Sequence, residues 1–237
     1  MKSNYCRELY ACFYSFVPFF LSIPFLFVYF LGRISISKGL IIICSLFIVH
    51  FFIFRRFYSE AVFIRAHFLT FALTIGLIWS ASSPALGLFT AVLAIFHLSE
   101  YISVGLWCPR KLTLESFLIN QSREYHGALL LAFIEYFIEK MYLLPDGVPL
   151  TWLWILVGLI MIIFGEFVRK LAMFTAKESF SHIIEDKVNQ EHRLITHGIY
   201  AYYRHPSYVG WFCWACGTQV LLANPFSFIV YIVVSYF

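Results

Sequence analysis

The sequence has little charge and no long polar domain. Only 13% of its 237 residues are Asp, Glu, Lys or Arg, whereas soluble domains contain about 25%. Four stretches contain no charged residue at all: Leu9–Gly32, Ala66–Ser99, Gly147–Gly165 and His205–Phe237. A bilayer crossing needs about 20 such residues. The composition therefore excludes a water-soluble protein and predicts a polytopic membrane protein.

Cysteine spacings typical of metal centres or disulfide frameworks are also scarce. The six cysteines are scattered, and only Cys213 and Cys216 are three positions apart. That pair falls in an apolar segment, where two small side chains one helical turn apart are expected to pack against a neighbouring helix. We expect no metal. The net charge of +4 is small and lies at the membrane face, which favours lipid headgroups over nucleic acid as partners.

Eight apolar segments are expected to be helical, so the fold class is all-α with about eight transmembrane helices in a single domain, residues 1–237. The second segment and the last two are short for a full crossing, and the last two are expected to form a hairpin. The segments are Ala11–Leu31, Gly39–Phe54, Ala61–Ser80, Leu86–Trp107, Tyr125–Leu144, Leu150–Ala172, Ser207–Ala223 and Phe226–Phe237.

The distribution of Lys and Arg predicts the orientation. If all eight segments cross, 14 of the 17 basic residues fall on one side of the membrane and 3 on the other. Polytopic proteins concentrate positive charge in the cytosol. Both termini and the polar segment 173–208 are therefore expected to be cytosolic.

Several carboxylates lie near the ends of apolar segments, namely Glu100, Glu135, Glu139 and Glu166. Ionisable groups at such depth are costly. Each side chain either has a polar partner inside the protein or reaches out to the lipid headgroups.

Chemistry is concentrated just before the last apolar segments. Pro206 is expected to begin a helix and to leave the next backbone N–H groups pointing out of its end, where Arg204 and His205 could help to bind an anion. The rings of Tyr200, Tyr203 and Tyr208 could flank a cationic ligand. The alternative is a helix cap with interfacial tyrosines and no ligand.

The motifs of this region closely resemble those of the isoprenylcysteine carboxyl methyltransferases. The resemblance rests on the run from Gly198 to Gly210, on Gly217-Thr218-Gln219 with Asn224-Pro225, on Gly165 to Ala176, and on His97 to Tyr101. It extends from about the third apolar segment to the end of the chain.

The resemblance implies a function and a site. Members of this family use S-adenosylmethionine to methylate the C-terminal prenylcysteine, farnesylated or geranylgeranylated, of processed CaaX proteins at the endoplasmic reticulum membrane. It implies Arg169 as the residue that holds the substrate carboxylate. Carried over residue by residue, it implies a cofactor site made of Glu185, His192, Arg193, Leu194, Ile195, Tyr200, His205, Pro206, Ser207 and Tyr208.

One departure from the family pattern concerns the end of the chain. The family continues into a cytosolic tail with an arginine and closely spaced glutamates that complete the site, whereas this sequence stops at Phe237 within an apolar run. We therefore expect this 237-residue form to have little or no methyltransferase activity.

Three other functions remain open at this stage. A phospholipid methyltransferase would share the cofactor segment but would need no arginine pocket for a carboxylate. A membrane sterol reductase carries a similar Arg-His-x-x-Tyr run but uses NADPH. A transporter or channel is less favoured, because the sequence shows neither an inverted repeat nor paired broken helices.

Overall fold

Helices are the only regular elements in the part of the chain that the structure describes. In this computed structural model, the described residues are 2–32, 35–56, 60–142, 149–182 and 194–236. They form two units, Met1–Phe117 and Leu118–Phe237, each with its own internal contacts. The expected all-helical fold is confirmed, and the single domain 1–237 stays a prediction.

The described residues of the first unit form five α-helices and two short 3₁₀ turns. The elements are α1 (Lys2–Tyr14), α2 (Val17–Phe30), α3 (Ile36–Phe54), α4 (Glu60–Trp79), α5 (Pro84–Trp107), η1 (Pro109–Lys111) and η2 (Leu114–Phe117). Helices α4 and α5 touch through glycine: a Cβ on Gly76 would lie 2.8 Å from the Gly87 carbonyl oxygen. Small residues allow such close approach of helices in membranes.

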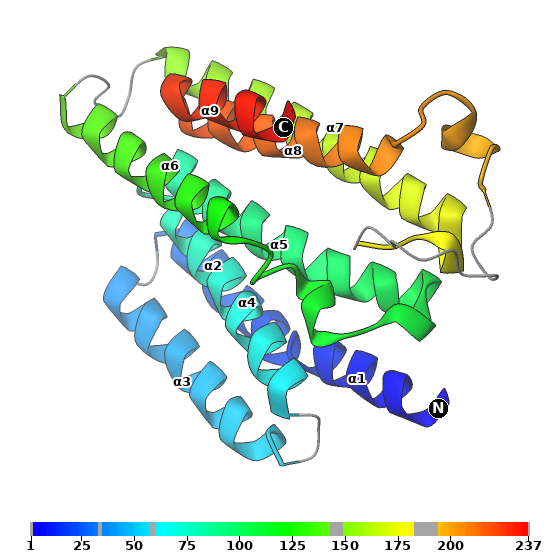
Figure 1. Cartoon of the computed structure of the whole chain (residues 1–237). Helices are drawn as coiled ribbons and strands as arrows, with labels where there is room; N and C mark the ends of the chain where they lie inside the picture. The colour runs from blue at the N-terminus through cyan, green and yellow to red at the C-terminus, as the bar shows by residue number, and fades with distance from the viewer. Residues whose placement is uncertain (1, 33–34, 57–59, 143–148, 183–193, 237) are drawn as a thin grey trace. The chain divides into compact units, whose positions relative to one another are not determined.

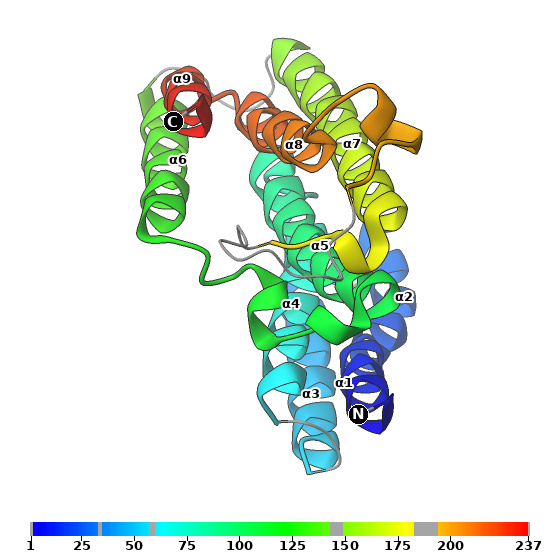
Figure 2. The ribbon, with the colours of Figure 1, turned by 45° about the vertical axis from the view of Figure 1, so that its right-hand side comes forward.

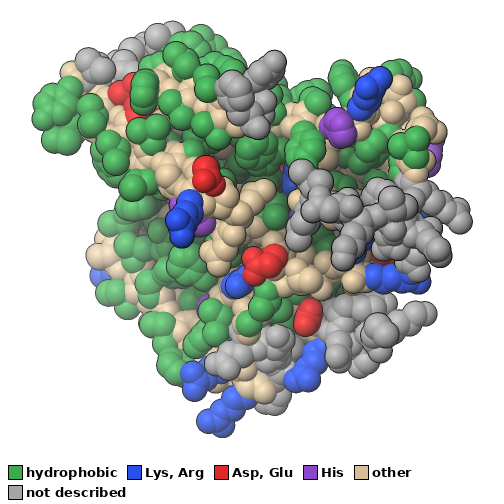
Figure 3. All heavy atoms as spheres, viewed as in Figure 1, with side chains coloured by type: hydrophobic (Ala, Val, Ile, Leu, Met, Phe, Trp, Pro, Cys, Tyr) green, Lys and Arg blue, Asp and Glu red, His purple; other side chains and the backbone are tan. Residues whose placement is uncertain are grey.

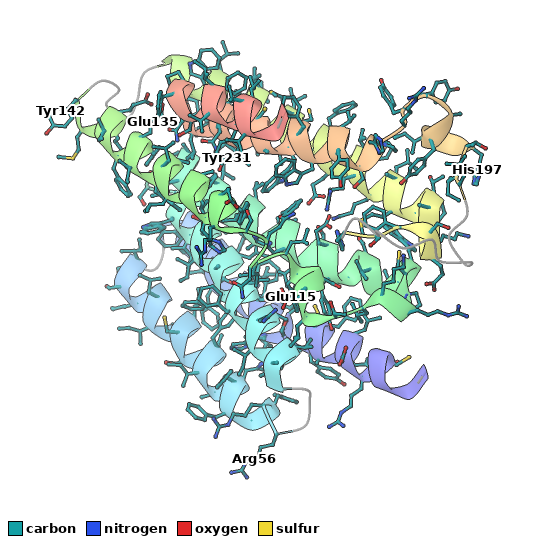
Figure 4. The ribbon with its side chains drawn as sticks, viewed as in Figure 1. Arg56, Glu115, Glu135, Tyr142, His197 and Tyr231 are labelled. Atoms are coloured by element: carbon teal, nitrogen blue, oxygen red, sulfur yellow. The ribbon has the colours of Figure 1, made fainter. Side chains whose placement is uncertain are left out.

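The surface of α3 is apolar along its length and basic at its end. Large exposed side chains include Ile41, Ile48 and Phe52, and Arg55 and Arg56 follow at its C-terminal end. Figure 3 shows hydrophobic side chains over this helix and basic ones gathered at the end where Figure 4 labels Arg56. Such a surface fits contact with lipid tails and then with headgroups.

In the second unit, the part of the chain that the structure describes forms four α-helices and two 3₁₀ turns. They are α6 (Arg123–Tyr142), α7 (Pro149–Ala176), η3 (Lys177–Ser179), η4 (Gly198–Ala201), α8 (Pro206–Leu222) and α9 (Pro225–Tyr236). Helices α7 and α8 run side by side in both ribbon views (Figures 1 and 2), and α9 lies against α6. Proline begins three of these helices, as its fixed φ and missing N–H favour.

Within the residues that the structure describes, five helical stretches are long and apolar enough to cross a membrane: Cys6–Phe30, Ile36–Phe54, Ala61–Trp79, Pro84–Trp107 and Trp152–Ser179. The first begins five residues earlier than expected and includes most of α1 and the whole of α2. The segments expected at 125–144, 207–223 and 226–237 are mostly helical but are not among these five. The protein is therefore a multi-pass membrane protein, while the count of eight spans and the final hairpin stay predictions.

Helix α9 is capped by a side chain from α6. Both oxygens of the Glu135 carboxylate accept hydrogen bonds at the start of α9, from the N–H of Phe226 and of Ser227, each at 2.6 Å. The first N–H groups of a helix have no partner within it. The Asn224 amide donates in turn to the Ala132 carbonyl oxygen at 2.7 Å. Glu135 thus has partners inside the protein, which settles the alternative left open for this residue.

Candidate functional site

The start of α8 forms one side of the candidate site. Pro206 is the first helical residue, as expected, with His205 before it in a non-helical conformation. The N–H groups of Tyr208 and Val209 both donate to the His205 carbonyl oxygen, at 3.1 and 3.2 Å. At most the Ser207 N–H is then left for a ligand, because Pro206 has none. The expectation that several N–H groups point out of this helix end is wrong, and an anion here needs a side-chain donor.

Arg169 of α7 can supply that donor. Its side chain is buried, with 5% of the residue exposed. Its Nη1 donates to the Ser207 hydroxyl oxygen at 3.1 Å and lies 3.4 Å from the Ser207 carbonyl oxygen. The arginine expected to hold the substrate and the serine expected to contact the cofactor are therefore direct neighbours.

Glycines bring Arg169 this close to α8. A Cβ on Gly210 would lie 2.6 Å from the Arg169 backbone nitrogen, and one on Gly165 would lie 2.6 Å from the Gly210 carbonyl oxygen. Both distances are too short for any side chain. The backbones of α7 and α8 therefore touch at this level, which places a long buried side chain of α7 under the first turn of α8.

A further glycine brings η4 to the end of α7. Gly198 has φ +59°, a left-handed conformation that other residues rarely adopt, and a Cβ there would lie 3.0 Å from the Thr175 methyl group. Tyr200, which follows in η4, is half-buried, whereas His197 is exposed at the outer end of this segment (Figure 4).

The rim of the site carries aromatic rings. His205 and Tyr208 have ring centroids 6.0 Å apart. Both residues are exposed, as is Tyr203. Exposed rings at a helix start can pack against a flat base or a cation that arrives from water.

Of the remaining predicted cofactor residues, the structure describes Leu194 and Ile195 but not the other three. Ile195 is half-buried and Leu194 is 89% exposed, so the described residues cover little of Leu194. Glu185, His192 and Arg193 lie outside the described residues. The structure thus brings together Arg169 and the run His205–Tyr208, and joins Tyr200 to α7 through η4.

One neighbour of Arg169 was not singled out from the sequence. His182 places its Nδ1 3.5 Å from Arg169 Nη2. The only signal was its presence among the four histidines of the polar segment, which does not tell them apart.

Two other polar side chains of this unit, Glu166 and Cys213, have structural partners. Glu166 pairs with Lys170 one turn later on α7, at 3.3 Å. The thiol of Cys213 lies 3.6 Å from the Met161 carbonyl oxygen, so it packs against α7 as expected. Among the described residues, no group of three or more His, Cys, Asp or Glu could hold a metal ion.

Comparisons with known proteins identify relatives of this chain. A model of the isoprenylcysteine carboxyl methyltransferase family matches residues 157–237, which contain the whole candidate site. The protein-S-isoprenylcysteine O-methyltransferase of Xenopus laevis is 46% identical over 178 residues, which cover 74% of this chain and 61% of that one. The corresponding Tribolium castaneum protein is 39% identical over 195 residues, covering 79% and 68%.

A solved structure is similar over almost the whole chain. It is described as the eukaryotic intramembrane Ras methyltransferase, isoprenylcysteine carboxyl methyltransferase. The match has a TM-score of 0.84 and 32% identity, and covers 97% of this chain and 85% of that one. By contrast, this chain spans about three fifths of the length of the vertebrate relatives, 61% for Xenopus laevis and 60% for Rattus norvegicus.

Proposed function

Because the chain belongs to the isoprenylcysteine carboxyl methyltransferase family, we propose that its candidate site belongs to an enzyme that transfers the methyl group of S-adenosylmethionine to the C-terminal carboxylate of a prenylated cysteine. The observation that carries this proposal is the contact between Arg169 and Ser207. This contact joins the buried cation of Arg169, which could bind a carboxylate, to the start of α8, which could bind the cofactor. Family membership does not favour a sterol reductase or a phospholipid methyltransferase.

The proposed reaction suits a site without a general base. An α-carboxyl group has a pKa of about 3.5 and is already ionised at neutral pH. The protein's task is then to hold the carboxylate in line with the methyl group and to replace its water shell. Orientation of this kind can supply roughly 7–11 kcal/mol. Arg169, which is buried and hydrogen-bonded to Ser207 of the neighbouring helix, fits that task.

The residues at the start of α8 are of the types that could bind S-adenosylmethionine, which contains a flat adenine base and a sulfonium cation. S-adenosylmethionine supplies an activated methyl group when it is bound. The exposed rings of His205 and Tyr208 offer flat surfaces to a base or a cation, and the Ser207 N–H could bind a carboxylate of the cofactor. Leu194, Ile195 and Tyr200 are proposed to complete this side together with Glu185, His192 and Arg193.

We propose that the site lies at the cytosolic face of the endoplasmic reticulum membrane. The charge distribution supports cytosolic termini and a cytosolic segment 173–208. A charged cofactor would then arrive from water, while a prenyl chain keeps about 0.8 kcal/mol for each CH₂ that stays in an apolar phase. Eight crossings, with α8 and α9 as a hairpin, are part of this proposal.

The test is ligand stabilisation followed by methyl transfer, in the full-length protein in lipid nanodiscs. S-adenosylhomocysteine should raise the unfolding temperature and NADPH should not. Labelled methyl groups should appear in farnesylcysteine as a base-labile ester, and not in farnesylcysteine amide or in phospholipid. Stabilisation by NADPH alone, or methyl transfer to phospholipid alone, would contradict the proposal.

A further inference from the structure

The guanidinium of Arg169 is held from two sides by acceptors on different segments. Nη1 donates to Ser207 of α8, and Nη2 faces the Nδ1 of His182, which follows η3. The planar guanidinium has five N–H groups in a fixed arrangement. Acceptors on both Nη atoms therefore fix the plane of the guanidinium group.

The chain beyond α7 turns back so that His182 reaches Arg169. Arg169 lies about two turns before the end of α7, and Lys177 then takes a left-handed φ of 47°. The Phe180 N–H closes the turn by donating to the Lys177 carbonyl oxygen at 2.8 Å. Phe180 is buried, and its ring meets that of His182 edge-on at 5.0 Å. A buried anchor thus sets where the imidazole lies.

Resting on the proposed function, we infer that His182 is a positioning residue, which accepts a hydrogen bond from Arg169 and so aims this arginine at the carboxylate that receives the methyl group. The distance of 3.5 Å is long for a hydrogen bond, and bonds of this kind often tighten when substrate binds. The bond requires a neutral His182 with its proton on Nε2, because Nδ1 must accept.

The same contact limits how strongly the substrate is held. A carboxylate that accepts two parallel hydrogen bonds from one guanidinium forms a strong bidentate pair. Its oxygens are then weaker nucleophiles. Ser207 and His182 already occupy donors on both Nη atoms, which leaves fewer for the substrate. The carboxylate is then oriented while one oxygen stays available to attack the methyl group.

Three substitutions separate this role from simple packing. His182→Leu removes the acceptor and keeps an apolar side chain against Phe180. His182→Asn places an amide oxygen near the position of Nδ1, whereas His182→Gln places one near Nε2. His126→Leu is the matched control, because His126 is an exposed histidine of α6 whose Nδ1 lies near the Ser122 carbonyl oxygen.

The experiment measures binding of farnesylcysteine, its uncharged amide and S-adenosylhomocysteine to each full-length variant in nanodiscs. The wild type should prefer the acid over the amide. In His182→Leu and His182→Gln, the ratio of the affinity for the acid to the affinity for the amide should fall about tenfold. A loss of this size is expected when one hydrogen bond to a charged group is removed. His182→Asn should restore it to within about threefold, and the affinity for S-adenosylhomocysteine should change less than about twofold throughout.

Three results would overturn the inference. If His182→Leu keeps the preference for the acid, or if His182→Asn loses it as fully as His182→Leu does, His182 does not act through its Nδ1, and the proposed function stands. If the wild type itself neither prefers the acid nor binds S-adenosylhomocysteine, the proposed function fails and this inference fails with it.

Discussion

Two junctions of the second unit are built in opposite ways. Where α7 meets α8, glycines let the backbones touch, and Gly165 and Gly210 leave no room for a Cβ. Where α6 meets α9, contact is made by polar side chains, with Glu135 capping the α9 N-terminus. Figure 4 shows Glu135 and His197 at opposite ends of this unit.

The two junctions therefore have different roles: the first sets the geometry of the candidate site, and the second caps a helix. The glycine contact sets where Arg169 lies relative to Ser207, so it determines the geometry of the candidate site. The Glu135 contact satisfies backbone N–H groups at the start of α9, which have no partner within the helix. We therefore expect damage at the first junction to affect both folding and ligand binding, and damage at the second to affect folding alone.

The largest effect is expected from Gly210→Ala. Its Cβ would meet the Arg169 backbone, so α7 and α8 must separate, at a cost of about 3 kcal/mol in unfolding free energy. Binding of S-adenosylhomocysteine should weaken at the same time, because Ser207 moves with α8. Thermal unfolding and ligand titration in one detergent would measure both.

Gly127→Ala is the matched control for this change. Gly127 lies in α6, and a Cβ there would meet nothing within 4 Å. Alanine is the better helix former by about 0.5–1 kcal/mol, so this variant should be as stable as the wild type or more so. Equal losses in the two variants would mean that the close contact of α7 and α8 does not limit stability.

A smaller loss is expected from Glu135→Ala. The N–H groups of Phe226 and Ser227 would lose their acceptor in a buried place, which costs about 2 kcal/mol. The affinity for S-adenosylhomocysteine should stay within about twofold of the wild type, since this junction does not touch the site. Glu124→Gln, which changes an exposed carboxylate on the same helix, should leave the stability close to that of the wild type. A large loss of ligand affinity in Glu135→Ala would show that the two junctions are not independent.

The smallest effect, and one of opposite sign, is expected from Ala223→Gly. Ala223 ends α8 with φ +61°, and the N–H of Asn224 donates to the Gln219 carbonyl oxygen at 3.0 Å, a Schellman ending that favours glycine. Glycine should raise the unfolding free energy by roughly 0.5–1 kcal/mol. Ala128→Gly, in the interior of α6, should lower it by about 1 kcal/mol. A drop in stability for Ala223→Gly would contradict the strained ending.

The sequence predicted the features that depend on nearby residues. Long uncharged runs predicted the helices, and Pro206 predicted the start of α8. It could not predict the cap of α9, because Glu135 lies 91 positions before Phe226 and nothing local links the two. The prediction of several free N–H groups at the start of α8 was wrong, because the N–H groups of Tyr208 and Val209 both donate to the His205 carbonyl oxygen. The contact between His182 and Arg169 could not be predicted either, because it depends on a turn after α7 whose geometry the sequence does not reveal.

The affinity for S-adenosylhomocysteine across three variants of the candidate site tests the central claim most directly. Tyr208→Ala and His205→Ala should weaken it by about tenfold, because both remove rings proposed to contact the cofactor. Arg169→Gln should leave it within about twofold while abolishing methyl transfer to farnesylcysteine. Unchanged affinity in both ring variants would show that the start of α8 is only a helix cap, and the account of a cofactor site joined to a carboxylate site through Ser207 would be wrong.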